Sequence, residues 1–288
     1  MKIILSRKGF DSAAGGIPSP ILDDGTMLPL PIPSRYCPIR YRDIELYGHE
    51  LGRVVEDLGA RRKSKGSWVP LTADHGAHLD PDLMTGARKR SRGWRPLFGQ
   101  ADGEQTLLER SGVGPGDLFL FFGWFRRAEV VGERYRFVRG AEDVHVLWGW
   151  LQVDGVWDLT RTREVPTWAA DHPHLDGTPR SRNALYLGER QLRIGGEPLG
   201  MPGAGVFRRW DDRLRLTAPG RSRSVWRLPG WFLPRGRRPL GYHSDPERWT
   251  RDGKHVLLQT VSRGQEFVLD AEEYPQACGW ARELLHGL

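Results

Sequence analysis

Two long apolar segments constrain the fold of this chain most strongly. The first, VGPGDLFLFFGWF at 113–125, is a Pro-Gly turn followed by an unbroken apolar run, which is typical of a strand buried on both faces. The second is VHVLWGWLQV at 144–153, and a short strand-like segment at 134–138 lies between them. Gly132 and Gly140 lie in or beside the connecting turns. The pattern therefore predicts an antiparallel meander.

The rest of the chain predicts short strands, hairpins and a few helices. Prolines at positions 18, 20, 29, 31 and 33 exclude regular helix from the first part of the chain. We expect an α+β fold with one β-rich domain over residues 1–288, and the pattern leaves open a barrel-like core and a weak division near residue 160. The expected elements are strands at 2–5, 255–261 and 265–270, a tight turn at 22–28, hairpins at 184–194 and 206–217, and helices at about 48–58, 102–113 and 273–286.

The composition is that of an ordinary globular chain. With 288 residues, of which 39% are hydrophobic and 27% charged, it can bury a sizeable core. No segment approaches the ~18–20 apolar residues of a membrane span, and the apolar start is too short for a signal peptide, so we expect a cytoplasmic protein without a membrane partner. Cys37 and Cys278 lie far apart without CxxC spacing, which supports neither a disulfide scaffold nor a thiolate zinc site.

The positive charge of the chain favours a polyanionic partner. The net charge is +7, and Arg-rich clusters occur at 61–65, 88–92, 221–227 and 235–238. Arginine beside tryptophan suits phosphate contact combined with base stacking. The alternatives are solvated loops and a coding bias toward arginine. The nucleic-acid-binding residues predicted in this way are Arg88, Arg90, Arg92, Trp94, Trp226 and Arg237.

The loop SRKGFDSAAGGIPSP at 6–20 follows the first strand and is rich in polar and glycine residues. Backbone N–H groups in such a loop can cradle a phosphate, with Arg7 and Lys8 adding charge, although the spacing is not that of a P-loop. Asp11 is a candidate base, nucleophile or ribose acceptor, or it closes an Asx turn onto Ala13.

The densest polar segment is TADHGAHLDPDL at 72–83. In an extended chain, residues two apart share a face, so His78, Asp80 and Asp82 can converge on one metal ion or one reacting group. Acid–base chemistry and binding of a divalent cation both fit this set, and no spacing specifies the metal. The alternative is that Asp80 caps a helix that begins at Pro81.

Further polar residues interrupt apolar or aromatic runs. His172 and His174 lie in WAADHPHLDG at 168–177. The strand at 265–270 alternates so that Gln265 and Glu266 point to opposite faces, and one of them is expected to look into a cleft, unless both lie at an exposed strand end. A helix cap is the expected role of Asp245, and His243 is expected at the surface.

Several motifs in a fixed order resemble a known family. MKIILSRKGFDSAAGGIPSPIL, HLDPDL followed by LFGQ, GDLFLFFGWFR, HVLWGWLQV, HPHL, NALYL and GQEFVLD are together similar to the third of the numbered nucleotide-modification-associated domain families, over residues 1 to about 285. The resemblance implies a setting in bacterial and phage systems that make or process modified nucleobases. It also implies a common pocket formed by the polar members of these motifs: Ser6, Arg7, Lys8, Asp11, Ser12, His78, Asp80, Asp82, Gln100, His172, His174, Asn183, Gln265, Glu266 and Asp270.

Two functions follow from these residues. The first is an enzyme acting on a nucleotide, a nucleoside or a base in DNA rather than RNA, with Asp11 or Asp80 as acid, base or nucleophile, assisted by His78. Lys8 and Arg7 would hold phosphate, and glycosidic-bond chemistry would suit a carboxylate near such cations. The second is a non-catalytic reader that stacks a modified base on Trp124, Trp148 or Trp150.

Overall fold

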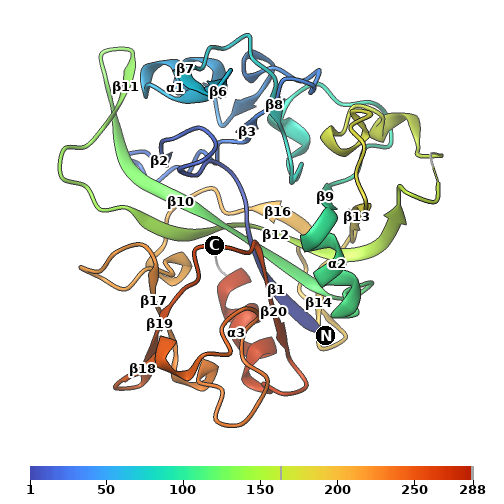
Figure 1. Cartoon of the computed structure of the whole chain (residues 1–288), viewed down its shortest axis with the longest axis vertical. Coiled ribbons are helices and arrows are strands. Elements are labelled where there is room, and N and C mark those ends of the chain that lie inside the picture. Colours follow the sequence, from blue (N-terminus) through green and yellow to red (C-terminus); the bar gives the residue numbers. More distant parts are fainter. Residues whose placement is uncertain (163, 287–288) are drawn as a thin grey trace.

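Two long antiparallel strands, β10 (Leu118–Val131) and β12 (Val144–Asp158), cross the middle of the molecule (Figure 1). The computed structural model describes residues 1–162 and 164–286. Both strands are almost completely buried over their first eight residues. With β11 (Arg134–Phe137) paired to β10, they form the predicted meander, and both long strands extend beyond the apolar runs.

The large sheet follows the order β20-β1-β10-β12-β13-β9. Strand β1 (Lys2–Arg7) is parallel to β10, and β20 (Glu266–Asp270) is antiparallel to β1. At the other end, β13 (Asn183–Gly188) pairs with β12 and with the edge strand β9 (Leu97–Ala101). The two ends of the sheet lie close together, as a hydrogen bond from Gln100 in β9 to Glu266 in β20 shows. The strands β9 and β20 do not pair with each other. The predicted β-rich α+β fold is confirmed, and no closed barrel forms among the described residues.

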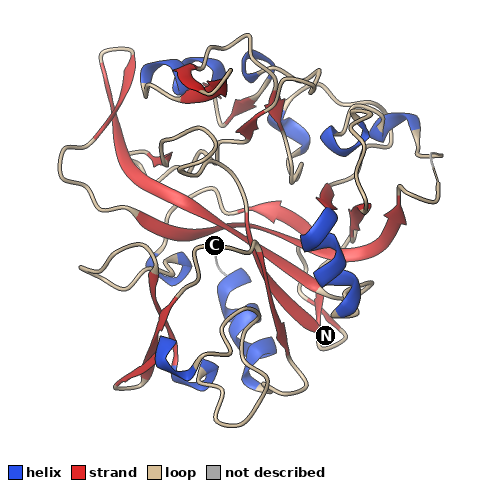
Figure 2. Cartoon of the chain, in the orientation of Figure 1, coloured by secondary structure: helices blue, strands red, loops and turns tan. Residues whose placement is uncertain are grey.

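Three helices and many short strands surround the sheet (Figure 2). The predicted helices correspond to α1 (Leu51–Asp57), α2 (Asp102–Arg110) and α3 (Gln276–Leu285). Because the longest helix among the described residues has only 10 residues, none reaches the length of a membrane span. Two short strands, β2 (Ser19–Ile21) and β16 (Ala204–Val206), belong to the large sheet, because they pair with β10 and β12. The short strands outside it are β3 (Ile32–Pro33), β4 (Glu45–Leu46), β5 (His49–Glu50), β6 (Arg61–Ser64), β7 (Ser67–Pro70), β8 (Ala77–His78), β14 (Arg193–Ile194), β15 (Glu197–Pro198), β17 (Val225–Pro229), β18 (Trp249–Asp252) and β19 (His255–Gln259).

The two predicted hairpins at 184–194 and 206–217 are wrong. Strand β13 lies between β12 and β9, and β14 pairs with β15 instead. Val206 and Arg215 each pair with β12 rather than with each other. The backbone groups of both segments are therefore satisfied by the long central strand, which local turn signals cannot reveal.

The core lies on both faces of the sheet. One face carries a cluster of aromatic rings, in which Phe98 lies 4.9 Å from Phe119 and 5.6 Å from Tyr186 between ring centroids. The other face packs Phe122 against Trp226, with ring centroids 4.9 Å apart. Residues 20–90 lie above β10 in Figure 1, and residues 210–286 lie mostly below it.

Two histidines belong to this core. Trp226 Nε1 donates a 3.0 Å hydrogen bond to His145 Nδ1, and burial lowers the pKa of His145 to about 3. His243 was expected at the surface but is fully buried, because its two ring nitrogens bond to Gly241 O and to the N–H of Val261. Burial lowers the pKa of His243 to about 4.

We expect the free energy of unfolding to decrease as the pH falls from about 6.5 to about 4. Both histidines stay neutral in the folded chain and take up a proton on unfolding, so acid favours the unfolded state, by about 1.4 kcal/mol per pH unit for each group. Urea unfolding at pH 7 and pH 4.5 measures this loss. The His145→Gln variant should show a shallower pH dependence, and an unchanged free energy between the two pH values would contradict the buried neutral state.

Candidate functional site

The segment at 78–82 lies against the free edge of β9. Strand β8 pairs with β3, which fixes His78 opposite Ile32. No helix begins at Pro81, so the prediction of a helix cap at Asp80 is wrong. Instead, Asp80 Oδ1 accepts a 2.7 Å hydrogen bond from the N–H of Gly99, because this N–H of the edge strand has no strand partner.

A short 3₁₀ helix, η4 (Pro173–Leu175), brings two more histidines to Asp80. His174 Nε2 lies 3.5 Å from Asp80 Oδ2, His172 Nε2 lies 3.4 Å from Asp80 Oδ1, and His78 Nε2 lies 3.9 Å from Asp80 Oδ2. Among the described residues, His78, Asp80 and His174 form the one group whose ligand atoms, all within 4.8 Å of one another, are arranged to hold a metal ion.

The position of one proton can be deduced from the hydrogen bonds of Asn183. Its amide nitrogen donates a hydrogen bond to the carbonyl oxygen of His174 at 2.8 Å, so its Oδ1 faces His174 Nδ1 at 2.7 Å and must accept a hydrogen bond from the Nδ1–H group. A neutral His174 therefore directs the lone pair of Nε2 at the carboxylate of Asp80. Two acceptors that face each other in this way require a cation between them or a proton on the ring.

Burial and mutual contacts determine the charges in this cluster. Burial lowers the pKa of His78 to about 4, which keeps its imidazole neutral at pH 7 and able to bind a metal. Burial alone would raise the pKa of Asp80, but His172 and His174 together hold it well below its usual range. The carboxylate is therefore ionised. The neutral imidazole of His78 together with this anionic oxygen suits a divalent cation.

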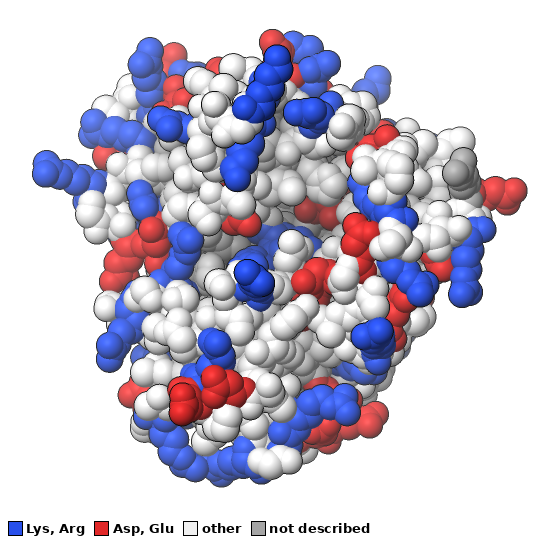
Figure 3. Space-filling view, viewed as in Figure 1, with Lys and Arg blue, Asp and Glu red and all other residues white. Residues whose placement is uncertain are grey.

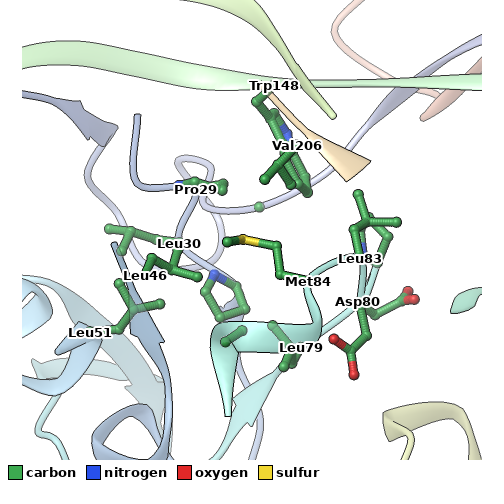
Figure 4. Close-up of a pocket in the computed structure, with 15 residues that line it drawn as sticks. Pro29, Leu30, Leu46, Leu51, Leu79, Asp80, Leu83, Met84, Trp148 and Val206 are labelled. Carbon is green, nitrogen blue, oxygen red and sulfur yellow. The ribbon is translucent and has the colours of Figure 1, made fainter. Parts of the chain in front are cut away.

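Two cavities border the cluster. One is an apolar pocket of about 30 Å³, in which Asp80 lies at the edge, across from Leu46 and Leu51 (Figure 4). It has room for about one or two water molecules and is too small for a nucleobase. The other is an open groove of about 640 Å³, lined by His174, Asn183 and Arg180 among others. This groove therefore borders the cluster at His174 and Asn183.

A second polar cluster lies beside the aromatic rings of the sheet. The carboxylate of Glu266 is 0% exposed, and its Oε1 accepts hydrogen bonds from Lys8 Nζ at 2.9 Å, Ser6 Oγ at 3.0 Å and the amide of Gln100. Lys8 also lies 4.7 Å from the ring centroid of Phe98. Glu266 Oε2 has no hydrogen-bond partner within the described part of the chain. The hydrogen bonds to Glu266 thus connect β1, β20 and β9.

Both clusters lie within the range that one family model matches. The family model of nucleotide modification associated domain 3 matches residues 2–270 of the 288. This chain belongs to that family. The resemblance inferred from the motifs is therefore confirmed, and the family name associates the chain with nucleotide modification. No curated protein matches this Nmad3 chain, and no solved structure matches it.

The structure divides the pocket predicted for the Nmad3 chain into two parts. Gly99 contacts the metal-type cluster and Gln100 contacts the Lys8–Glu266 cluster, and neighbouring residues of a strand point to opposite faces. The first part holds His78, Asp80, His172, His174 and Asn183, and the second holds Ser6, Lys8, Gln100, Gln265 and Glu266.

The other residues of the predicted pocket lie apart from both clusters. Asp11 closes the Asx turn, since its Oδ1 accepts the N–H groups of Ala13 and Ala14 at 2.7 Å. Asp82 is held by Arg90 through two hydrogen bonds of 2.5 and 2.6 Å. Arg7 donates to the carbonyl oxygens of Ser262 and Gly264, Ser12 is exposed in its loop, and Asp270 lies at the opposite end of β20 from Glu266.

Most of the predicted nucleic-acid-binding residues of the Nmad3 chain have partners within the protein. Trp226 is 0% exposed, so no nucleobase can stack on it. Arg90 binds Asp82 and lies 4.1 Å from the ring of Trp94, and Arg88 forms a 2.7 Å ion pair with Asp171. Arg237 also has partners within the protein, because it donates to the carbonyl oxygens of Trp231, Leu233 and Pro234. Arg92, in contrast, is exposed.

Sequence reasoning did not select Gly99, although a glycine inside a strand is a known signal for close approach of another group. A Cβ atom at this position would overlap the ring of His174.

The Gly99→Ala variant should therefore weaken metal binding roughly 10–100-fold, because the added methyl group displaces His174 from Asp80. Isothermal titration with Zn²⁺ and Mn²⁺ measures this change. Gly103→Ala is the matched control, since a Cβ atom there meets nothing within 4 Å. Equal affinity of the Gly99→Ala variant and the unaltered protein would show that His174 is not a ligand.

Proposed function

We propose that this Nmad3 chain is a metal-dependent enzyme that acts on a nucleotide, a nucleoside or a modified base in DNA, with the metal bound by His78, Asp80 and His174. The observation that carries the proposal is the orientation of His174. Its Nδ1 proton is held by Asn183, so in the neutral ring Nε2 faces the buried carboxylate of Asp80 as an acceptor. A cation between the two atoms resolves this conflict.

The distances support a single metal ion. Two ligand atoms that are each 2.0–2.1 Å from a tetrahedral Zn²⁺ lie about 3.4 Å apart. His174 Nε2 and His78 Nε2 lie 3.5 and 3.9 Å from the same oxygen of Asp80, so small side-chain movements would complete the geometry. Two histidines and one carboxylate leave further coordination positions for water or substrate, as in catalytic rather than structural sites.

The surroundings supply a route for the substrate and a further polar group. The open groove lined by His174 and Asn183 borders the cluster, and its volume of about 640 Å³ can hold a nucleotide. His172 Nε2 is buried and has Asp80 Oδ1 at 3.4 Å as its partner, so it lies close enough to contact a ligand of the metal. A bound metal would act as a Lewis acid and would lower the pKa of a bound water.

The alternative of a non-catalytic reader has less support. Trp148 is 5% exposed and Trp150 is 7% exposed, so neither presents a free ring face to a flipped base. Trp124 is covered by Arg223, whose guanidinium carbon lies 4.0 Å from the tryptophan ring.

Metal analysis and nucleoside mass spectrometry together test the proposal. The purified protein is stripped with EDTA, titrated with Zn²⁺, Mn²⁺ and Fe²⁺, and incubated with free nucleotides, plain DNA and modified DNA. We expect one metal ion per chain and a mass change in a nucleoside only when metal is present. A mass change that persists at the same rate in EDTA would overturn the role of the metal. Failure of all three ions to bind would overturn the site.

A further inference from the structure

A separate basic groove lies beside β3 and β8, and β8 is the strand that contains His78. Its volume is about 570 Å³, and its walls come from the opening loop at Ala13 and Ala14, from residues 33–40, from β6 and from residues 74–76. The cationic residues of this basic groove are Arg35, Arg40, Arg62 and Lys63, and the one acid among its lining residues is Asp74.

Most of this positive charge is not neutralised by the protein. The carboxylate of Asp74 binds Arg42, which lies outside the basic groove. The guanidinium of Arg40 donates to the carbonyl oxygen of Asp74 and forms no ion pair with a described residue. Within the described chain, Arg35, Arg62 and Lys63 form no ion pair within 4 Å. Figure 3 shows Lys and Arg side chains over the upper part of the molecule, where Figure 1 places these strands.

Two observations indicate that an anion belongs in this groove. The Nε atom of Arg62 is buried and has no hydrogen-bond partner among the described residues, and a buried donor of this kind normally has an acceptor. Burial and the neighbouring Arg62 guanidinium also lower the pKa of His75, which records the positive potential inside the groove.

Aromatic side chains at the groove point to more than a free phosphate. Tyr36 in the groove wall is 63% exposed, and Trp68, which pairs with Lys63 across β6 and β7, is 38% exposed. Lys63 Nζ lies 5.5 Å from the ring centroid of Trp68. Exposed rings beside unpaired cations form the combination that binds single-stranded nucleic acids, because bases stack while phosphates meet the cations.

We infer that the basic groove binds the phosphate backbone of a single-stranded nucleic acid, whose bases stack on Tyr36 and Trp68. Ser34 and Gly76 line the basic groove and lie next to the ends of β3 and β8, two residues from Ile32 and His78. Two residues of an extended chain span about 6.6 Å. A strand held in the basic groove therefore lies close to the metal ligand His78, and its assignment as the substrate rests on the proposed function.

Fluorescence anisotropy with a labelled 12-nucleotide oligonucleotide tests the inference without any assay of activity. We expect Arg35→Glu/Lys63→Glu to weaken binding of single-stranded DNA at least tenfold. The slope of log affinity against log salt should fall by about 1.4, because two phosphate contacts are lost. Tyr36→Ala should weaken binding roughly tenfold. The matched control is Arg251→Glu/Lys254→Glu, which changes the net charge equally at exposed positions on β18 and the following turn.

The outcomes separate this inference from the proposed function. The inference would be overturned if both charge-reversal pairs weakened binding equally, or if neither weakened it. It would also be overturned if duplex DNA bound as tightly as the single strand. Single-stranded RNA of the same sequence forms a further arm, and a preference for it would identify RNA as the strand that is bound. Asp80→Asn should bind the oligonucleotide with unchanged affinity, so loss of activity in that variant tests the metal centre alone.

Discussion

Replacing Asp80 with asparagine should abolish metal binding and reduce turnover by at least about a hundredfold. The substitution removes the one anionic ligand of the proposed centre and leaves three histidines without a negative charge between them. The fold should remain intact, because the asparagine oxygen can still accept the hydrogen bond from Gly99. Metal content by mass spectrometry, and nucleoside analysis of the products, measure the two effects.

Asp11→Asn is the matched control for this experiment. Asp11 is also a candidate from the sequence, but asparagine can close the same Asx turn onto Ala13 and Ala14. We expect full metal binding and turnover in this variant. If Asp11→Asn loses turnover while Asp80→Asn keeps it, the reaction centre lies at the opening loop and not at the histidines.

Replacing Lys8 with methionine should lower the free energy of unfolding by about 3–5 kcal/mol. The side chains of Lys8 and Glu266 are only 8% and 0% exposed, so the substitution leaves a buried carboxylate without its cation. Ser6 and Gln100 can still donate to Glu266, but two neutral hydrogen bonds do not compensate for an unpaired buried charge. Urea unfolding at pH 7 measures the loss.

A double variant separates this structural effect from a role in catalysis. Lys8→Met/Glu266→Gln removes both charges, so it should recover most of the stability, and it should retain turnover because Lys8 lies outside the metal centre. Lys63→Met, at an exposed lysine, should change the stability by less than about 0.5 kcal/mol. A loss below about 1 kcal/mol in the Lys8→Met variant would mean that water reaches the ion pair.

Periodicity predicted the parts of the fold that local patterns determine. The unbroken apolar run gave the buried strand β10, and alternation at 265–270 placed Glu266 on the face opposite Phe267. The hairpin predictions at 184–194 and 206–217 were wrong, because the partner of both segments is the distant strand β12. Pairing with a strand that is far away in sequence leaves no local signal.

The candidate site shows the same limit. The spacing of two residues correctly put His78 and Asp80 within reach of each other, but it also grouped Asp82 with them, and Asp82 binds Arg90. That His174 joins Asp80 depends on how a loop 94 residues further along returns to β9. Sequence alone selected His174 only as a polar residue in a candidate motif, and it gave no information that this residue meets Asp80.

The loop that presents Asp80 has a second consequence, for the solubility of the protein. Strand β9 ends the large sheet, and an uncovered edge strand is a template for pairing with other molecules. Asp82 exchanges backbone hydrogen bonds with Leu97, and Asp80 occupies the N–H of Gly99, so this edge is covered along most of its length. Residues 80–82 therefore protect the sheet against aggregation. Changes that lift this loop away should produce intermolecular association as well as loss of the centre.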